Sequence, residues 1–146
     1  MTERHKSRWL VAVLLVFPLL VTACGGKSAS ETTAQPAVLE RVSGTDIYRI
    51  TLTAETAKRL EVKTAAAHQV GGGTAVPYAA VFYSATGETW AYVNPRPLTF
   101  VRQAIVVDRI DGNQAVLSGG LSSGTKVATV GVPELHGIEL GAGGGQ

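Results

Sequence analysis

Apolar and polar positions alternate along much of the chain between residues 45 and 138. From Asp46 to Leu52, the side chains of Tyr48, Ile50 and Leu52 fall on one face of an extended backbone. This period of two residues is typical of a half-buried strand. Further strands are expected at residues 61–67, 78–83, 90–93, 99–107, 115–117 and 126–130. Short strands with regular turn signals predict an all-β domain, a small β-roll or barrel of about six to eight strands.

One short helix is expected to interrupt the strands, over residues 54–60. Thr53 precedes it, and a threonine hydroxyl at that position caps a helix N-terminus. Glu55 lies in the first turn, with Lys58 and Arg59 in the last, so both ends match the helix dipole. The predicted fold class is therefore all-β with one short helix.

Glycine and proline mark the expected breaks between strands. Gly71-Gly72-Gly73 is interpreted as a flexible break. Asn94-Pro95-Arg96-Pro97 is expected outside any sheet, because its two prolines have no N–H for a ladder. Asp111-Gly112 is a strong hairpin-turn signal.

The N-terminal segment is typical of a secretory signal peptide over residues 1–23. Basic residues up to Arg8 precede an apolar stretch from Trp9 to Ala23, and small residues lie next to Cys24. Those 15 positions are short for a membrane-spanning helix, which needs roughly 20 residues. The segment around Cys24 resembles the lipobox of bacterial lipoproteins, which implies diacylglycerol on the thiol. The alternative is an uncleaved anchor helix with a chance cysteine.

Lipidation of Cys24 would place the protein on the extracytoplasmic face of a cell membrane. Two acyl chains anchor a protein stably, whereas one is marginal. Cys24 is the only cysteine, so no disulfide can form within the chain. Residues 24–44 are expected to be a flexible tether, 45–138 the β domain and 139–146 a flexible tail.

The formal charge of +2 comes from the signal segment. Residues 1–23 hold three basic residues and one acidic residue, so cleavage leaves ten of each. A formally neutral mature chain has no electrostatic footprint for nucleic acid. We therefore expect no nucleic-acid partner.

Candidate metal and catalytic groups are sparse. His68, His136 and Glu134 are the only set considered for a metal, and they lack motif spacing, so no metal or other cofactor is expected besides the covalent lipid. Serines in the glycine-rich turns lack a nucleophile elbow. The chain is interpreted as a non-enzyme.

Aromatic side chains concentrate around the expected hairpin at residues 78–93. Most are expected in the core or in cross-strand pairs. Tyr83, Trp90 and Tyr92 are the candidate contacts for a protein partner.

Two stretches resemble the membrane-proximal domain of the periplasmic adaptor, or membrane fusion protein, family of efflux systems. The first is Ile50 to Ala65, similar to that domain's early strand-helix-strand. The second begins at Val76-Pro77-Tyr78-Ala79-Ala80-Val81 and ends in the Gly120-Leu121-Ser122-Ser123-Gly124 turn and Gly131. The helical hairpin, the lipoyl-like domain and the barrel that separate these stretches in an adaptor are missing.

The resemblance implies docking beside an inner-membrane transporter. The expected function is a lipid-anchored binding or assembly module accessory to a transporter or efflux system. The early and late strands are expected to pack together and close one domain. Two alternatives stay open: a lipoprotein that binds a small apolar molecule or ion, and a structural adaptor remnant.

Overall fold

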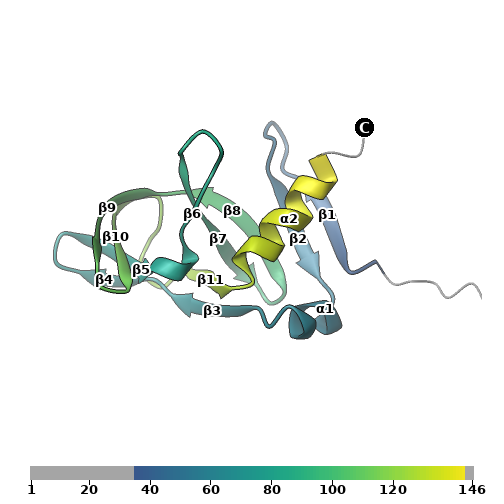
Figure 1. The fold of residues 1–146 in the computed structure, drawn as a ribbon, viewed down its shortest axis with the longest axis horizontal. Helices are drawn as coiled ribbons and strands as arrows, with labels where there is room; N and C mark the ends of the chain where they lie inside the picture. Colours follow the sequence, from purple (N-terminus) through teal and green to yellow (C-terminus); the bar gives the residue numbers. More distant parts are fainter. Residues whose placement is uncertain (1–34, 144–146) are drawn as a thin grey trace, which may run out of the picture. The chain divides into compact units, whose positions relative to one another are not determined.

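A computed structural model describes residues 35–143 (Figure 1). The predicted signal peptide, Cys24 and most of the predicted tether lie outside the described residues, as do residues 144–146. The strands are β1 (Ala37–Arg41), β2 (Tyr48–Leu52), β3 (Lys63–Ala66), β4 (His68–Val70), β5 (Gly73–Pro77), β6 (Phe82–Tyr83), β7 (Thr89–Arg96), β8 (Thr99–Ala104), β9 (Val106–Asp111), β10 (Gln114–Gly119) and β11 (Lys126–Val130). The helices are α1 (Ala54–Arg59), the 3-10 turn η1 (Tyr78–Ala80) and α2 (Val132–Gly143).

The strands form two antiparallel sheets, which confirms the all-β class. The larger sheet has the order β1-β2-β8-β7-β11-β3, with β6 also paired to β7. The smaller sheet has the order β4-β5-β10-β9. Within the described residues, the two sheets do not close into a barrel.

Helix α1 forms where the sequence predicts it. The Thr53 hydroxyl accepts a hydrogen bond from the Thr56 backbone N–H at 3.1 Å, which satisfies one of the unpaired donors of the first turn. The helix ends at Leu60, and the following residue, Glu61, has a positive φ of 50°. A residue in the left-handed region stops a helix, because it turns the backbone out of helical geometry.

The domain extends beyond both of its predicted boundaries. Residues 37–41 were expected in the tether, but they form β1, paired to β2 from Ala37↔Leu52 to Arg41↔Tyr48. Residues 139–143 were expected in the tail, but they complete helix α2. Strand β1 pairs with the edge of β2, and helix α2 packs on one face of the larger sheet. Without these segments, that edge and that face would be open.

Three other expectations were wrong in detail. Asn94 to Arg96 extend β7, with a register shift against β8 between Val93 and Arg96. Pro95 is tolerated there because β11 pairs with β7 only at Val93, so no ladder hydrogen bond to β11 needs an N–H from Pro95. Gly71 and Gly72 form the predicted break, as the turn of the β4–β5 hairpin with Gly72 at a φ of +91°, but Gly73 begins β5. Residues 78–80 form η1 instead of a strand.

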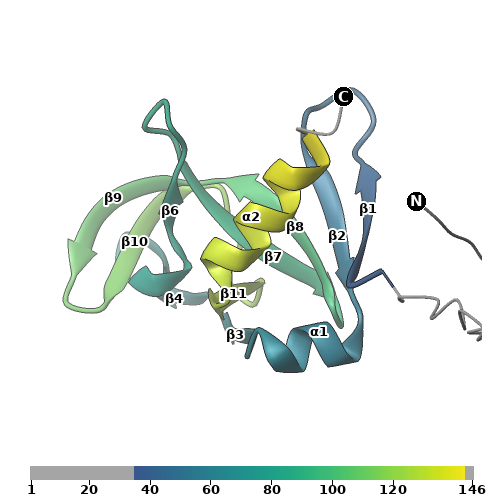
Figure 2. The same ribbon diagram turned by 45° about the vertical axis from the view of Figure 1, so that its right-hand side comes forward.

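Two apolar clusters hold these layers together. The first lies between α2 and one face of the larger sheet, and its buried residues include Ile50, Tyr92 and Leu135. The second brings residues of the smaller sheet, such as Val76 and Leu117, against Val127 of the larger. Figures 1 and 2 show α2 crossing the β2, β8 and β7 strands on one side of the sheet. Helix α2 therefore covers a face that would otherwise be open.

Candidate functional site

The three predicted partner contacts lie in three different environments. Tyr83 is 53% exposed and has the exposed Tyr78 beside it. A hydrogen bond with Tyr78 raises the pKa of Tyr83 above its ordinary value. Trp90 is half-buried, and the guanidinium of Arg102 lies 4.8 Å from the centre of its ring. Tyr92 is fully buried, so its prediction as a surface contact was wrong: its ring belongs to the core beneath α2.

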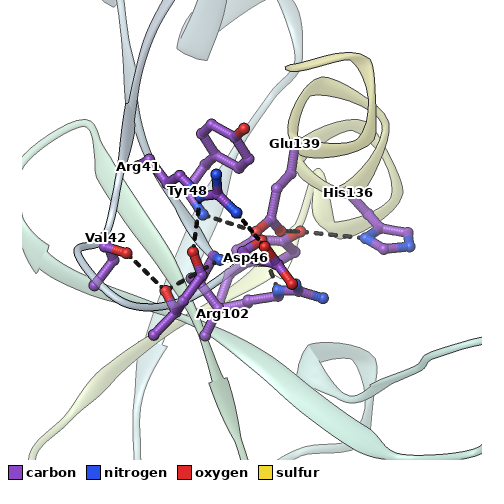
Figure 3. Close-up of polar contacts among 10 residues, drawn as sticks. Arg41, Val42, Asp46, Tyr48, Arg102, His136 and Glu139 are labelled. Atoms are coloured by element: carbon purple, nitrogen blue, oxygen red, sulfur yellow. Dashed lines mark hydrogen bonds and ion pairs between the residues drawn. The ribbon is translucent and has the colours of Figure 1, made fainter. Parts of the chain in front are cut away.

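The densest polar arrangement surrounds the carboxylate of Glu139, on α2. This side chain is 4% exposed, although a charged group is rarely buried without partners. Its Oε1 accepts a hydrogen bond from the Tyr48 backbone N–H at 3.1 Å and lies 3.0 Å from Arg102 Nε. Its Oε2 accepts a hydrogen bond from the Tyr92 hydroxyl at 2.6 Å. We call Tyr48, Tyr92, Arg102, His136 and Glu139 the Glu139 cluster (Figure 3).

Aromatic rings enclose one side of the Glu139 cluster. Phe82 stacks on Tyr92, with ring centroids 4.9 Å apart, and also lies 5.0 Å from the His136 ring. His136 Nδ1 lies 3.4 Å from the Tyr92 hydroxyl oxygen. That oxygen can accept a hydrogen bond from an Nδ1–H while the hydroxyl donates to Glu139. These rings keep water away from the phenol, so the hydrogen bond to the carboxylate is made in a low-dielectric environment.

Arg102 connects the Glu139 cluster to the loop between β1 and β2. Its Nη2 donates to the Asp46 backbone oxygen at 3.1 Å. The Asp46 carboxylate forms an ion pair with Arg41, whose Nε donates to the Thr45 oxygen at 2.9 Å. Figure 3 shows this chain of contacts running from α2 to the N-terminal hairpin. The contacts join strand β1, which lies before the predicted domain, and helix α2, which extends beyond its predicted end.

The geometry of the Glu139 cluster supports a structural role. Both oxygens of the carboxylate have partners, and the side chain is only 4% exposed, so the charge faces the protein and not the solvent. Burial, followed by the hydrogen bond to Glu139, raises the pKa of Tyr92 well above its ordinary value. The phenol therefore stays protonated at neutral pH and acts as a hydrogen-bond donor. The cluster fastens α2 to the sheet.

Sequence reasoning missed Arg102 and Glu139. Glu139 was placed in a tail, and Arg102 was taken as a residue of the predicted strand at 99–107 and of the stretch that resembles adaptors. A signal was present, because Val132, Leu135 and Ile138 repeat at helical spacing and Pro133 suits a first helical turn. Gly137 and Gly141 obscured it, since glycine is the poorest ordinary helix former.

The residues considered for a metal site do not come together. His68 is exposed on β4, in the smaller sheet, whereas His136 belongs to α2 and packs against Phe82. Glu134 is exposed on α2. Across residues 35–143, no three or more His, Cys, Asp or Glu side chains gather closely enough to hold a metal ion.

In the described part of the chain, no helix combines the length and the hydropathy needed to cross a bilayer. Comparison with protein-family models, with curated proteins and with solved structures finds no match to this chain.

Proposed function

We propose that this chain is a lipid-anchored, non-enzymatic binding or assembly module that docks beside a membrane transporter on the extracytoplasmic face of a membrane. The anchor would be a covalent lipid on Cys24, as the resemblance to the lipobox implies. The transporter follows from the resemblance to the membrane-proximal domain of periplasmic adaptors.

The observation that supports this proposal most directly is the pairing of the early and late segments. Strand β2, from the first resembling stretch, pairs with β8 from the second through Ile50↔Phe100. Strand β3 pairs with β11 through Ala65↔Val127. The two stretches thus form one sheet without the domains that separate them in an adaptor. The short β4–β5 hairpin occupies the position of those missing domains in the sequence.

The exposed tyrosines offer a contact surface for a transporter subunit. Tyr78 and Tyr83 are 42% and 53% exposed, on η1 and β6. Tyrosine is enriched at protein interfaces, because it combines a large apolar ring with a hydroxyl. These two side chains are the residues that we would change first.

The anchor is tested by membrane fractionation of cells that express the full chain. The unchanged protein should stay with membranes, and Cys24→Ala should be released. Ser28→Ala, a nearby change outside the predicted lipidation position, is the control and should stay bound. Membrane association of Cys24→Ala would refute the anchor.

The partner is tested by crosslinking in intact membranes and mass spectrometry. A transporter subunit should be the main crosslinked protein, and Tyr78→Ala combined with Tyr83→Ala should weaken that crosslink. Val38→Ala is the matched control, because Val38 is also 53% exposed but lies on β1. If no transporter subunit is captured, docking is excluded even where the anchor is established.

A further inference from the structure

A hollow of about 540 Å³ lies where the end of β7 meets the start of β11. This volume is within the range of small-molecule sites, roughly 300–1,000 Å³. Its lining includes Asn94, Arg96, Gln103, Gly124, Thr125 and Lys126. We infer that this hollow binds a small phosphate-bearing group through Arg96 and Lys126. This site is separate from the Glu139 cluster, and it does not depend on the lipid anchor.

The charges around the hollow favour an anion. Two lining residues, Arg96 and Lys126, are cationic, and none is acidic. Elsewhere in residues 35–143, Arg41, Arg49, Arg102 and Arg109 each form an ion pair with a carboxylate, whereas Lys58, Arg59 and Lys63 form none. Within the same residues, no carboxylate oxygen lies within 4.0 Å of the charged nitrogens of Arg96 or Lys126. Two cations without a carboxylate partner in that part of the chain therefore share one hollow.

One wall of the hollow, the turn between β7 and β8, is held without any ligand. The Asn94 amide donates to the Arg96 oxygen at 2.8 Å and to the Thr99 oxygen at 2.9 Å. The rings of Pro95 and Pro97 fix the φ angles of the residues directly before and directly after Arg96. The base of the Arg96 side chain is consequently fixed before a ligand arrives.

The opposite wall is the loop that leads into β11. The Gly124 N–H donates to the Ala67 oxygen at 2.7 Å, and the Ala67 N–H donates to the Thr125 oxygen at 2.8 Å. The Gln103 side chain also donates to the Gly120 oxygen. Because these bonds fix both walls, binding does not require the backbone to become ordered, which lowers its entropic cost.

A phosphate group suits this pair of cations. The arginine guanidinium presents a planar fork of donors to two phosphate oxygens, and the lysine ammonium adds a compact charge. A phosphate monoester carries about −1.5 to −2 charges at neutral pH, which nearly matches the two cations. The volume leaves room for the rest of the ligand. The ligand is either a free phosphate monoester, which carries this charge, or a phospholipid headgroup, whose phosphodiester carries one negative charge.

The experiment follows the backbone amide signals of Gly124 and Thr125 by NMR, with the full chain in neutral detergent micelles. Inorganic phosphate is the first probe. The second is phosphatidylglycerol mixed into the micelles, compared with phosphatidylcholine at the same fraction. The test variant is Arg96→Gln with Lys126→Gln. Lys58→Gln with Arg59→Gln is the control, because it removes the same charge from exposed positions on α1.

Saturable shifts with phosphate are expected for the unchanged chain and the control. The test variant should lose at least about tenfold in affinity, because each charge-assisted hydrogen bond contributes more than a neutral one. If phosphatidylglycerol saturates the shifts and displaces phosphate, the ligand is a headgroup; if only inorganic phosphate acts, it is a free phosphate compound. Shifts with neither probe, or an equal loss in the control, would overturn the inference. An unchanged melting temperature of the test variant shows that it is folded.

Discussion

The Tyr92 hydroxyl donates to Glu139 Oε2 across 2.6 Å, although 47 residues separate the two in the chain. Tyr92 belongs to β7, at the centre of the larger sheet, and Glu139 to the C-terminal helix. Helix α2 is held on the sheet by its apolar core, and this contact and the Arg102–Glu139 ion pair add specific polar contacts.

Glu139→Ala should lower the free energy of unfolding by about 3 kcal/mol. Removing one partner of a buried ion pair costs roughly 3–5 kcal/mol, and the lower end applies because Arg102 remains 20% exposed. Urea unfolding measures the loss. Glu134→Ala, an exposed glutamate on the same helix, should change stability little. Equal losses in the two variants would mean that the Glu139 cluster contributes nothing specific.

Stability should fall as the pH rises above the ordinary tyrosine pKa of 10.0, because the pKa of Tyr92 is raised in the folded state. The unfolded chain loses this proton first, so the contribution of the protonated phenol is complete below about pH 10 and declines above it. Urea unfolding between pH 8 and 11 gives the slope. Tyr92→Phe should flatten that slope, whereas the exposed Tyr83→Phe should retain most of it. A steep slope in Tyr92→Phe would assign the pH dependence to other groups.

Leu135→Ala should destabilise the protein by about 2–5 kcal/mol, because Leu135 is fully buried between α2 and the sheet. Leu140→Ala on the same helix should stay within about 0.5 kcal/mol, since Leu140 is 61% exposed. Thermal unfolding of both variants provides the comparison. Similar melting temperatures for the two would show that α2 does not depend on its packed face.

Gly120→Ala should cost more than Gly44→Ala, although both glycines have a positive φ. A Cβ at Gly120 would lie 2.5 Å from the Ala104 oxygen, whereas one at Gly44 meets no atom within 4 Å. Gly44→Ala should therefore cost only its backbone strain, about 1–2 kcal/mol. Gly120→Ala adds a steric clash and should cost roughly 2–4 kcal/mol. Chemical denaturation tests the order, and a reversed order would contradict this account of the loop.

Elements that depend on neighbouring residues were predictable. Helix α1 follows from the Thr53 cap and the charges of its two ends, and these interactions span only a few positions. Strand β11 lies where a strand was expected, from Lys126 to Val130. The β9–β10 turn forms close to its predicted place, where Gly112 supplies a positive φ of 55°.

Elements that depend on distant partners were not predictable. Strand β1 is short and polar at its end, and it is ordered by the edge of β2. Helix α2 contains several glycines, and it is ordered by the core under it and by the partners of Glu139. Of the candidate contacts, Tyr92 was misplaced because alternation gives the face of a strand but does not show what covers that face.

The sequence by itself determined the all-β class, the short helix and the turns, because each follows from composition or from contacts within a few residues. It also indicated the signal peptide and Cys24 as the anchor, which remain predictions. Only the tertiary structure decided that β2 joins β8, that α2 buries Glu139 and that Arg96 and Lys126 line one hollow. Those relationships join residues far apart in the chain, and their free energy arises only when the whole sheet has assembled and water has left the space between them.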